Sequence, residues 1–261
     1  MKRLAFTLVV TTALFAAALA GAQPVQRGDL RIGFDATFAP HALPRDRLAP
    51  VTIGLHGTVA TTDGSHPPQL RRITIGLNSY GRITTRGLPS CRPNELESIS
   101  PATALSRCRS ALVGHGHFGA ELAVSSQSTV PIVGKILAFN SSRGGRQAIA
   151  VHIYASTPVQ ASVVLLFKIE HRRHDKFGTV VSTRIPKIAS DLGYVTDISL
   201  SFGRRYRFGG EQLSFISASC AAPAGFPGAI FSFAKGSFLF ANGQRLTSTV
   251  VRDCAVRRAG R

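Results

Sequence analysis

The chain has 261 residues, 44% of them hydrophobic, which is enough to bury a core of ordinary size. Its 31 Lys and Arg residues outnumber its 13 Asp and Glu residues, giving a formal net charge of +18 at pH 7. Such an excess favours contact with anionic partners. After residue 22 no apolar run is long enough to span a bilayer as a helix, which argues against an integral membrane protein.

The first 22 residues have the composition of a signal peptide. Met1-Lys2-Arg3 is basic, residues 4–20 are apolar, and Ala20-Gly21-Ala22 offers small residues for cleavage. Cleavage after Ala20 is the alternative. We therefore expect an exported, soluble mature domain over residues 23–261, either secreted or associated with the cell envelope.

Alternating apolar and polar residues dominate the first part of that domain. Period-two patterns cover residues 30–38, 51–55 and 73–77, and a turn at 78–81 leads to residues 82–85. Alternation of this kind is typical of strands with one buried face. It predicts an antiparallel β structure.

A cysteine-bounded excursion interrupts the strands between residues 87 and 116. Cys91 opens it and Cys108 closes it. Between them, Ser100-Pro101 predicts the start of a helix, with serine as the N-cap and proline at the first helical position.

More strands are expected after the excursion, over residues 111–124, 132–139, 147–155, 159–170, 178–186, 198–208 and 245–251. Residues 163–167 are continuously apolar, as in a strand covered on both faces, and Asn242-Gly243 is a strong hairpin signal. Roughly twelve strands in all indicate an all-β fold, an antiparallel β-sandwich or jelly roll. We expect a single domain over 23–261. Two small sandwiches divided near residues 125–130 are the alternative.

The four cysteines are expected to form disulfides. An oxidising compartment and an even count favour this chemistry, and the spacings contain no C-x2-C pattern of the kind that binds structural zinc. Three pairings are possible. We expect Cys91 with Cys108 and Cys220 with Cys254, because each pairing closes a short loop, and each then stabilises the fold by about 3 kcal/mol.

Three groups of histidines are candidate sites. His115 and His117 stand two apart on an expected strand, so both imidazoles face the same side and are weak candidates for a metal site. Nothing in the sequence nominates a third ligand, so we expect neither a metal nor another cofactor. His152 is interpreted as a packed, hydrogen-bonded histidine, and residues 171–176 as a solvated polar turn.

Carboxylates give no clear catalytic pair. Glu95 and Glu97 are only two residues apart, whereas the two acids of a glycosidase face each other from separate strands across a cleft. The other acidic residues on expected strands are Asp35, Glu121, Glu170, Asp197 and Glu211. The chain also lacks the G-x-S-x-G and H-E-x-x-H motifs. We assign no catalytic residue and favour a protein that is not an enzyme.

Basic residues form several short clusters that define a candidate site for anionic polymers. Its members are Arg71, Arg72, Arg172, Arg173, Arg204, Arg205 and Arg207. If these arginines lie close together in the folded protein, they form a binding patch. If they are scattered over the surface, they are solvated charges. We do not expect nucleic acid as the partner, because the chain is predicted to be exported and lacks a recognisable binding motif. The sequence does not define an oligomeric state.

The chain resembles a group of uncharacterised exported, β-rich proteins from GC-rich, actinobacterial-type genomes. The resemblance lies in Gly87-Leu88-Pro89-x-Cys91, in Cys108-x-x-Ala111-Leu112-Val113-Gly114-x-Gly116, and in Ala218-x-Cys220-x-Ala222-Pro223 with Cys254. It implies export and disulfides, and brings no activity, ligand or cofactor with it.

Three functions are therefore open from the sequence. The first is non-enzymatic association with anionic envelope or extracellular polymers, which predicts salt-sensitive retention on an anionic matrix. The second is a carbohydrate-active hydrolase, which requires two carboxylates about 5–10 Å apart in a cleft. The third is a carrier of a hydrophobic ligand, which requires a large apolar cavity between the sheets.

Overall fold

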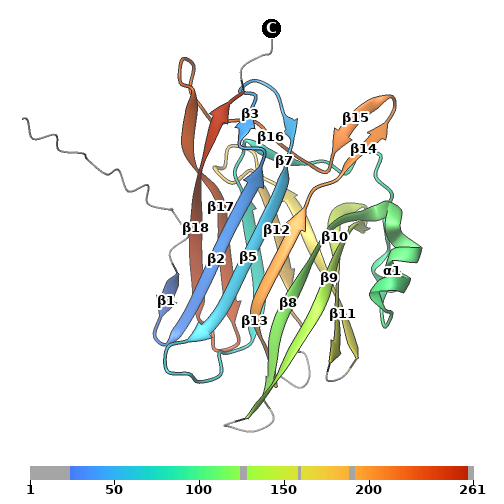
Figure 1. The fold of residues 1–261 in the computed structure, drawn as a ribbon, viewed down its shortest axis with the longest axis vertical. Helices are drawn as coiled ribbons and strands as arrows, with labels where there is room; N and C mark the ends of the chain where they lie inside the picture. The colour runs from blue at the N-terminus through green and yellow to red at the C-terminus, as the bar shows by residue number, and fades with distance from the viewer. Residues whose placement is uncertain (1–23, 124–127, 158–159, 188–191, 258–261) are drawn as a thin grey trace, which may run out of the picture.

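The computed structural model describes residues 24–123, 128–157, 160–187 and 192–257. In this part of the chain, thirteen strands form one large sheet that curls on itself (Figure 1). In spatial order they are β1 (Val25–Arg27), β2 (Leu30–Ala39), β5 (Thr52–Thr61), β13 (Gly193–Phe202), β8 (Leu112–Ala123), β9 (Thr129–Arg143), β10 (Arg146–Thr157), β11 (Ala161–His171), β12 (Thr179–Arg184), β6 (Leu70–Leu77), β17 (Gly228–Phe240), β18 (Arg245–Val256) and β3 (Ala42–Leu43). The predicted signal peptide lies outside the described residues.

Neighbouring strands of this sheet pair antiparallel, except β18 with β3, which pair in parallel. The period-two patterns explain the curl. On β2, for example, Leu30, Ile32 and Phe34 are buried, while the residues between them are more exposed. One face of each strand is thus apolar, and curling lets those faces meet and exclude water. The predicted all-β, antiparallel fold is confirmed, and its facing layers belong to one continuous sheet.

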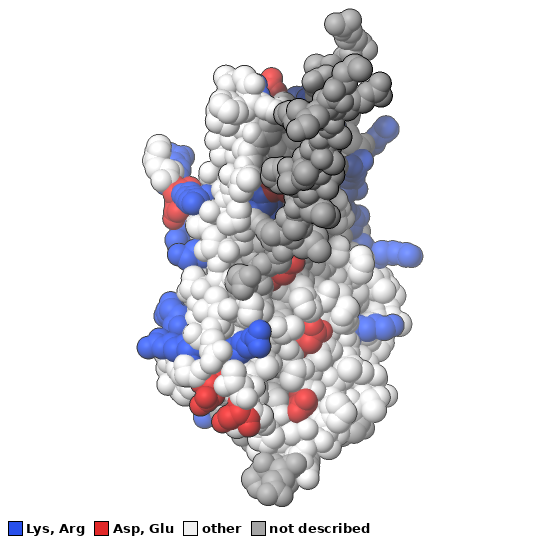
Figure 2. All heavy atoms as spheres, turned by 60° about the vertical axis from the view of Figure 1, so that its left-hand side comes forward, with Lys and Arg blue, Asp and Glu red and all other residues white. Residues whose placement is uncertain are grey.

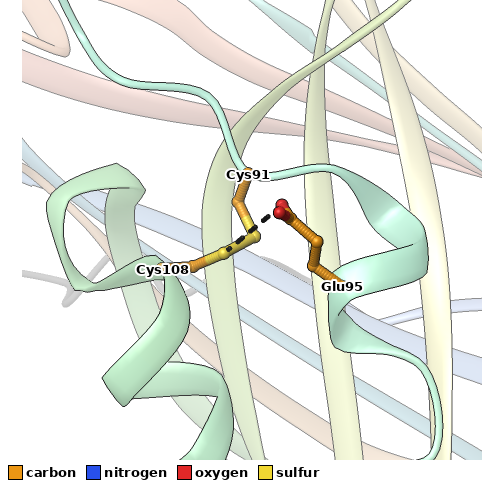
Figure 3. Close-up of side chains that lie close together, drawn as sticks. All are labelled: Cys91, Glu95 and Cys108. Atoms are coloured by element: carbon orange, nitrogen blue, oxygen red, sulfur yellow. Dashed lines mark hydrogen bonds between the residues drawn. A yellow bond between two sulfur atoms is a disulfide. The ribbon is translucent and has the colours of Figure 1, made fainter.

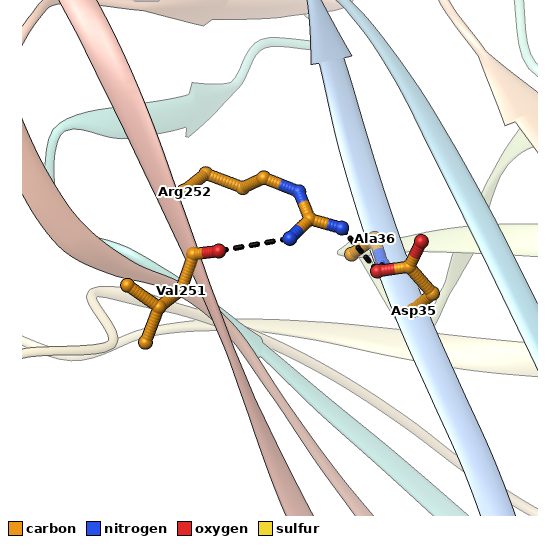
Figure 4. Close-up of polar contacts among 4 residues, drawn as sticks. All are labelled: Asp35, Ala36, Val251 and Arg252. Atoms are coloured by element: carbon orange, nitrogen blue, oxygen red, sulfur yellow. Dashed lines mark hydrogen bonds and ion pairs between the residues drawn. The ribbon is translucent and has the colours of Figure 1, made fainter. Parts of the chain in front are cut away.

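The two edges of the sheet come together around phenylalanine rings. Phe34 of β2 lies edge-on to Phe238 of β17, with the ring centroids 5.6 Å apart, and Phe38 lies 5.0 Å from Phe233. Arg252 of β18 forms an ion pair with Asp35 of β2 on the outside (Figure 4). Large aromatic side chains from both edges therefore fill this part of the interior.

Two smaller sheets accompany the large one. One comprises β4 (Ala49–Pro50), β16 (Ile216–Ala218) and β7 (Gly81–Ile83), and the other is a hairpin of β14 (Arg205–Phe208) and β15 (Glu211–Ser214). Phe215, just before β16, is fully buried. The Cys220–Cys254 disulfide ties the chain after β16 to β18.

The excursion after β7 packs against the outer side of the sheet. It contains the 3-10 turns η1 (Pro93–Leu96) and η2 (Arg109–Ala111) and the helix α1 (Pro101–Cys108) (Figure 1). The Ser100 side chain accepts a hydrogen bond from the Thr103 amide at 3.2 Å, so the predicted N-cap is confirmed. Buried Leu96 and Ala104 join Phe139 of β9 and Ala150 of β10 in a second apolar cluster.

The Cys91–Cys108 disulfide holds this excursion together (Figure 3). Both predicted pairings are thus confirmed, and two disulfides indicate an oxidising, extracytoplasmic environment. Glu95 places a carboxylate oxygen 4.0 Å from the Cys108 sulfur. Because both sulfurs are committed to the disulfide, this trio of side chains is not a metal site. Helices able to cross a membrane are absent from the described residues.

Candidate functional site: an apolar cavity within the curled sheet

The interior of the curled sheet contains a cavity of about 500 Å³. Its walls come from the inner faces of β5, β6 and β8 to β13, and they are almost entirely aliphatic and aromatic. The lining side chains include Leu55, Ala120, Leu122, Ile132, Ile153, Val163, Phe167, Val195, Ile198 and Leu200. Protein interiors are normally packed as densely as organic crystals, so an apolar space of this volume stands out from the rest of the core.

Buried side chains close one end of the cavity. Phe202 and Phe215, together with Ile216 of β16, are all buried where the small sheet covers the interior. Leu122 and Ile132, near the other end of the lining strands, are only partly buried although they line the same space.

The sequence explains why one half of the interior is filled and the other is not. The filled part contains Phe38 of β2 and Phe233 of β17, whose ring centroids lie 5.0 Å apart, whereas Phe34 and Phe238 form part of the cavity wall. The strands around the cavity mostly present alanine, valine, isoleucine and leucine to the same interior.

A polar trio lies at the edge of the cavity. The Tyr194 hydroxyl donates a hydrogen bond to the Glu121 carboxylate at 2.6 Å and lies 3.0 Å from Nδ1 of His66. Burial, reinforced by the hydrogen bond and charge of Glu121, raises the pKa of Tyr194 to about 12. The same hydrogen bond lowers the pKa of Glu121. At neutral pH the trio thus pairs a neutral phenol with an ionised carboxylate.

The outer face of the same sheet carries a second polar feature. A shallow hollow of about 350 Å³ is lined by Asp35, His56, His115, His117, Ser199 and Ser201, among others. His117 and His115 both face this side, as predicted, and the structure adds His56 from β5 and Asp197 from β13. No sequence pattern indicates this grouping, because only strand register brings residues so far apart in the chain together.

The candidate arginines lie on different elements. Arg72 on β6 is the cross-strand partner of Arg184, whereas Arg172 sits in the turn beyond the other end of β12 and pairs with Glu170 and Asp175. Six residues of strand separate these positions, roughly 20 Å of chain. On the face shown in Figure 2, basic side chains lie along both margins with acidic ones between them.

Other members of the same set have local roles. The Arg204 guanidinium donates hydrogen bonds to the carbonyls of Arg109 and Leu112, at 3.1 and 2.8 Å, and so ties β14 to the start of β8. Arg205 and Arg207 are exposed on β14, and Arg173 is exposed in the β11–β12 turn. Arg71 is partly buried on β6. Binding of an anionic polymer stays a prediction from composition.

The remaining candidates act in the structure rather than in a site. The Glu95 carboxylate accepts a hydrogen bond from the Arg92 amide at 2.8 Å and so caps η1, while Glu97 is exposed. His152 is fully buried, with Nε2 3.0 Å from the Ile99 carbonyl, and burial lowers its pKa. Its interpretation as a packed, hydrogen-bonded histidine is confirmed.

Comparison of the chain with protein-family models, with curated proteins and with solved structures finds no match. The function must therefore be argued from the geometry of the site itself.

Proposed function

We propose that this protein is an extracytoplasmic, non-enzymatic carrier of an elongated apolar ligand such as an acyl chain, secreted or held at the cell envelope. The observation that carries the proposal is the cavity of about 500 Å³ with an apolar wall. Ligand pockets in proteins typically measure about 300–1,000 Å³ and are lined mainly by apolar side chains.

The energetic argument rests on the amount of apolar surface that a ligand covers. Each methylene transferred from water to such a wall contributes about 0.8 kcal/mol, so an acyl chain with ten buried methylenes gains about 8 kcal/mol before the costs of binding. The ligand also restores dispersion contacts that the wall lacks when the cavity is empty. An aliphatic chain suits the narrow space between aliphatic walls.

The chemistry of the wall favours binding over catalysis. Among the described lining residues, the titratable side chains are His56, whose imidazole ion-pairs with Asp197 on the outer face, and Tyr194, at the cavity edge. The described wall contains no carboxylate, whereas a glycosidase needs two. In the outer hollow, the lining carboxylate Asp35 is already paired with Arg252.

The experiment uses an uncharged probe so that the net charge of +18 cannot account for binding. N-phenyl-1-naphthylamine fluoresces strongly in apolar surroundings, and we expect saturable enhancement with mature protein, displacement by palmitate, and little change in 0.5 M NaCl.

Two neighbouring residues of β9 provide matched variants. Ile132 lines the cavity, whereas Val133 points outward and is 64% exposed. We expect Ile132→Trp to weaken probe binding at least tenfold and Val133→Trp to leave it unchanged. Equal effects of the two substitutions, or binding that salt abolishes, would remove the proposal.

A further inference from the structure

We propose that the outer face of β5, β13 and β8 binds one divalent transition-metal ion, best represented by zinc, through His56, Asp197 and His117. Two imidazoles and one carboxylate are a ligand set that zinc accepts, with a water completing the tetrahedron. The inference is independent of the apolar cavity, which lies on the opposite face of these strands.

Strand register places the two imidazoles symmetrically. Ser199 of β13 is the cross-strand partner of His56 on one side and of His117 on the other. With neighbouring strands about 4.8 Å apart, the two histidine backbones are about 10 Å apart, which leaves room for an ion between the side chains. Asp197 lies two residues before Ser199 and shares its outward face.

An irregularity in β13 fixes that orientation. The register between β13 and β8 shifts between Val195 and Asp197, so Thr196 is an extra residue at this point. As a result, Val195 faces the cavity while Asp197, two residues later, faces outward. Without the extra residue, both side chains would point to the same side of the sheet.

Binding of one ion requires the imidazoles to rotate, because the three donor atoms do not all lie within 4.8 Å of one another. Asp197 Oδ2 lies 3.5 Å from Nδ1 of His56, and Oδ1 lies 4.0 Å from Nε2 of His117. Ligand atoms at about 2.1 Å from a tetrahedral zinc are about 3.4 Å from one another. The histidine side chains are 53% and 68% exposed, so both imidazoles can turn toward an ion above Ser199, which lies between them.

Asp197 supplies a negative charge for a bound cation, although Lys135, the cross-strand partner of His117, places a positive charge on the same face. Asp35, a carboxylate that lines the adjoining hollow, is paired with Arg252 (Figure 4). Charges elsewhere on the surface are screened over about 8 Å at physiological ionic strength. The adjoining hollow leaves space for the water ligand.

The test is isothermal titration of the mature chain, purified without a histidine tag, with Zn²⁺ alone. We expect one ion per chain with micromolar affinity. The substitutions His56→Ala, His117→Ala and Asp197→Asn should each weaken binding at least tenfold, with circular dichroism confirming the fold. The matched control is His174→Ala, a histidine exposed in the β11–β12 turn, which should bind as the wild type does.

A second readout separates a defined site from loose association. Co²⁺ in place of Zn²⁺ should give the visible absorption of tetrahedral coordination, and this signal should vanish in His56→Ala and His117→Ala. No heat with Zn²⁺ at millimolar concentration, or binding that survives the double substitution of His56 and His117, would overturn the inference. Ile132→Trp should not affect metal binding, so the two proposals fail separately.

Discussion

Adding carbon atoms to the cavity wall should stabilise the protein, whereas the same addition in the filled core should destabilise it. Ala120 and Ala138 are both inward-facing alanines, on the neighbouring strands β8 and β9. Ala120 borders the cavity of about 500 Å³. Ala138 is fully buried. Its cross-strand partner is Gly114, and the Phe202 ring occupies the space that a Cβ atom on Gly114 would need.

The expected magnitudes follow from this difference in packing. Replacing alanine by leucine adds three carbons, which at about 0.8 kcal/mol each gives at most about 2.4 kcal/mol. Because the wall at Ala120 is partly open to solvent, we expect Ala120→Leu to gain about 1 kcal/mol. At Ala138 there is no space, so Ala138→Leu should lose about 1–3 kcal/mol through overpacking.

Urea unfolding followed by far-ultraviolet circular dichroism measures both changes, since the chain has no tryptophan for fluorescence. Lipid must be extracted first, because a ligand that binds the folded state adds its own stabilisation. The reasoning is refuted if Ala120→Leu destabilises the protein as much as Ala138→Leu, since the interior near Ala120 would then be as full as the rest.

Three further predictions concern stability. Because burial lowers the pKa of His152, the unfolded chain takes up a proton before the folded chain does. Stability is therefore complete above about pH 6.5 and falls below it, by at most about 1.4 kcal/mol per pH unit. Urea unfolding at pH 7.5 and 5.0 tests this, and His152→Gln should lose less on acidification; an equal loss contradicts the assignment. Replacing Cys91 and Cys108 together by serine opens a loop of 17 residues and should cost about 3 kcal/mol, and a cost below about 1 kcal/mol would show that the disulfide is dispensable. Arg252→Met keeps the aliphatic stem but loses the ion pair with Asp35, so it should cost about 1 kcal/mol at low salt and less in 1 M NaCl; a cost that salt does not change would point to packing instead.

The two halves of the curled sheet have different roles. The filled half, with Phe38 and Phe233 in contact, supplies the packing that stabilises the fold. The other half carries the same alternation of apolar and polar residues but leaves space inside. Since hydrophobic burial against the opposite wall is incomplete there, a bound ligand would add stability to that half.

Local features of the fold were readable from the sequence because they depend on neighbouring residues. Alternation along residues 30–38 predicts a strand with one buried face, and β2 has it. Ser100 caps α1, as serine before proline predicts. Both disulfides close short loops, so the nearest cysteines were the correct partners. The arginine clusters were equally visible, but adjacency in sequence says nothing about clustering across strands.

Only the tertiary structure decided how the strands are ordered and where the interior is empty. Ala120 and Ala138 lie in segments that the sequence predicts as strands, yet the sequence contains no signal that one borders a cavity and the other a packed ring, because this depends on what the opposite wall contributes. The grouping of His56 with His117 likewise follows from β13 lying between β5 and β8, and from one extra residue in β13. A period-two pattern fixes the face of a side chain, whereas its neighbours across the sheet are set by long-range pairing.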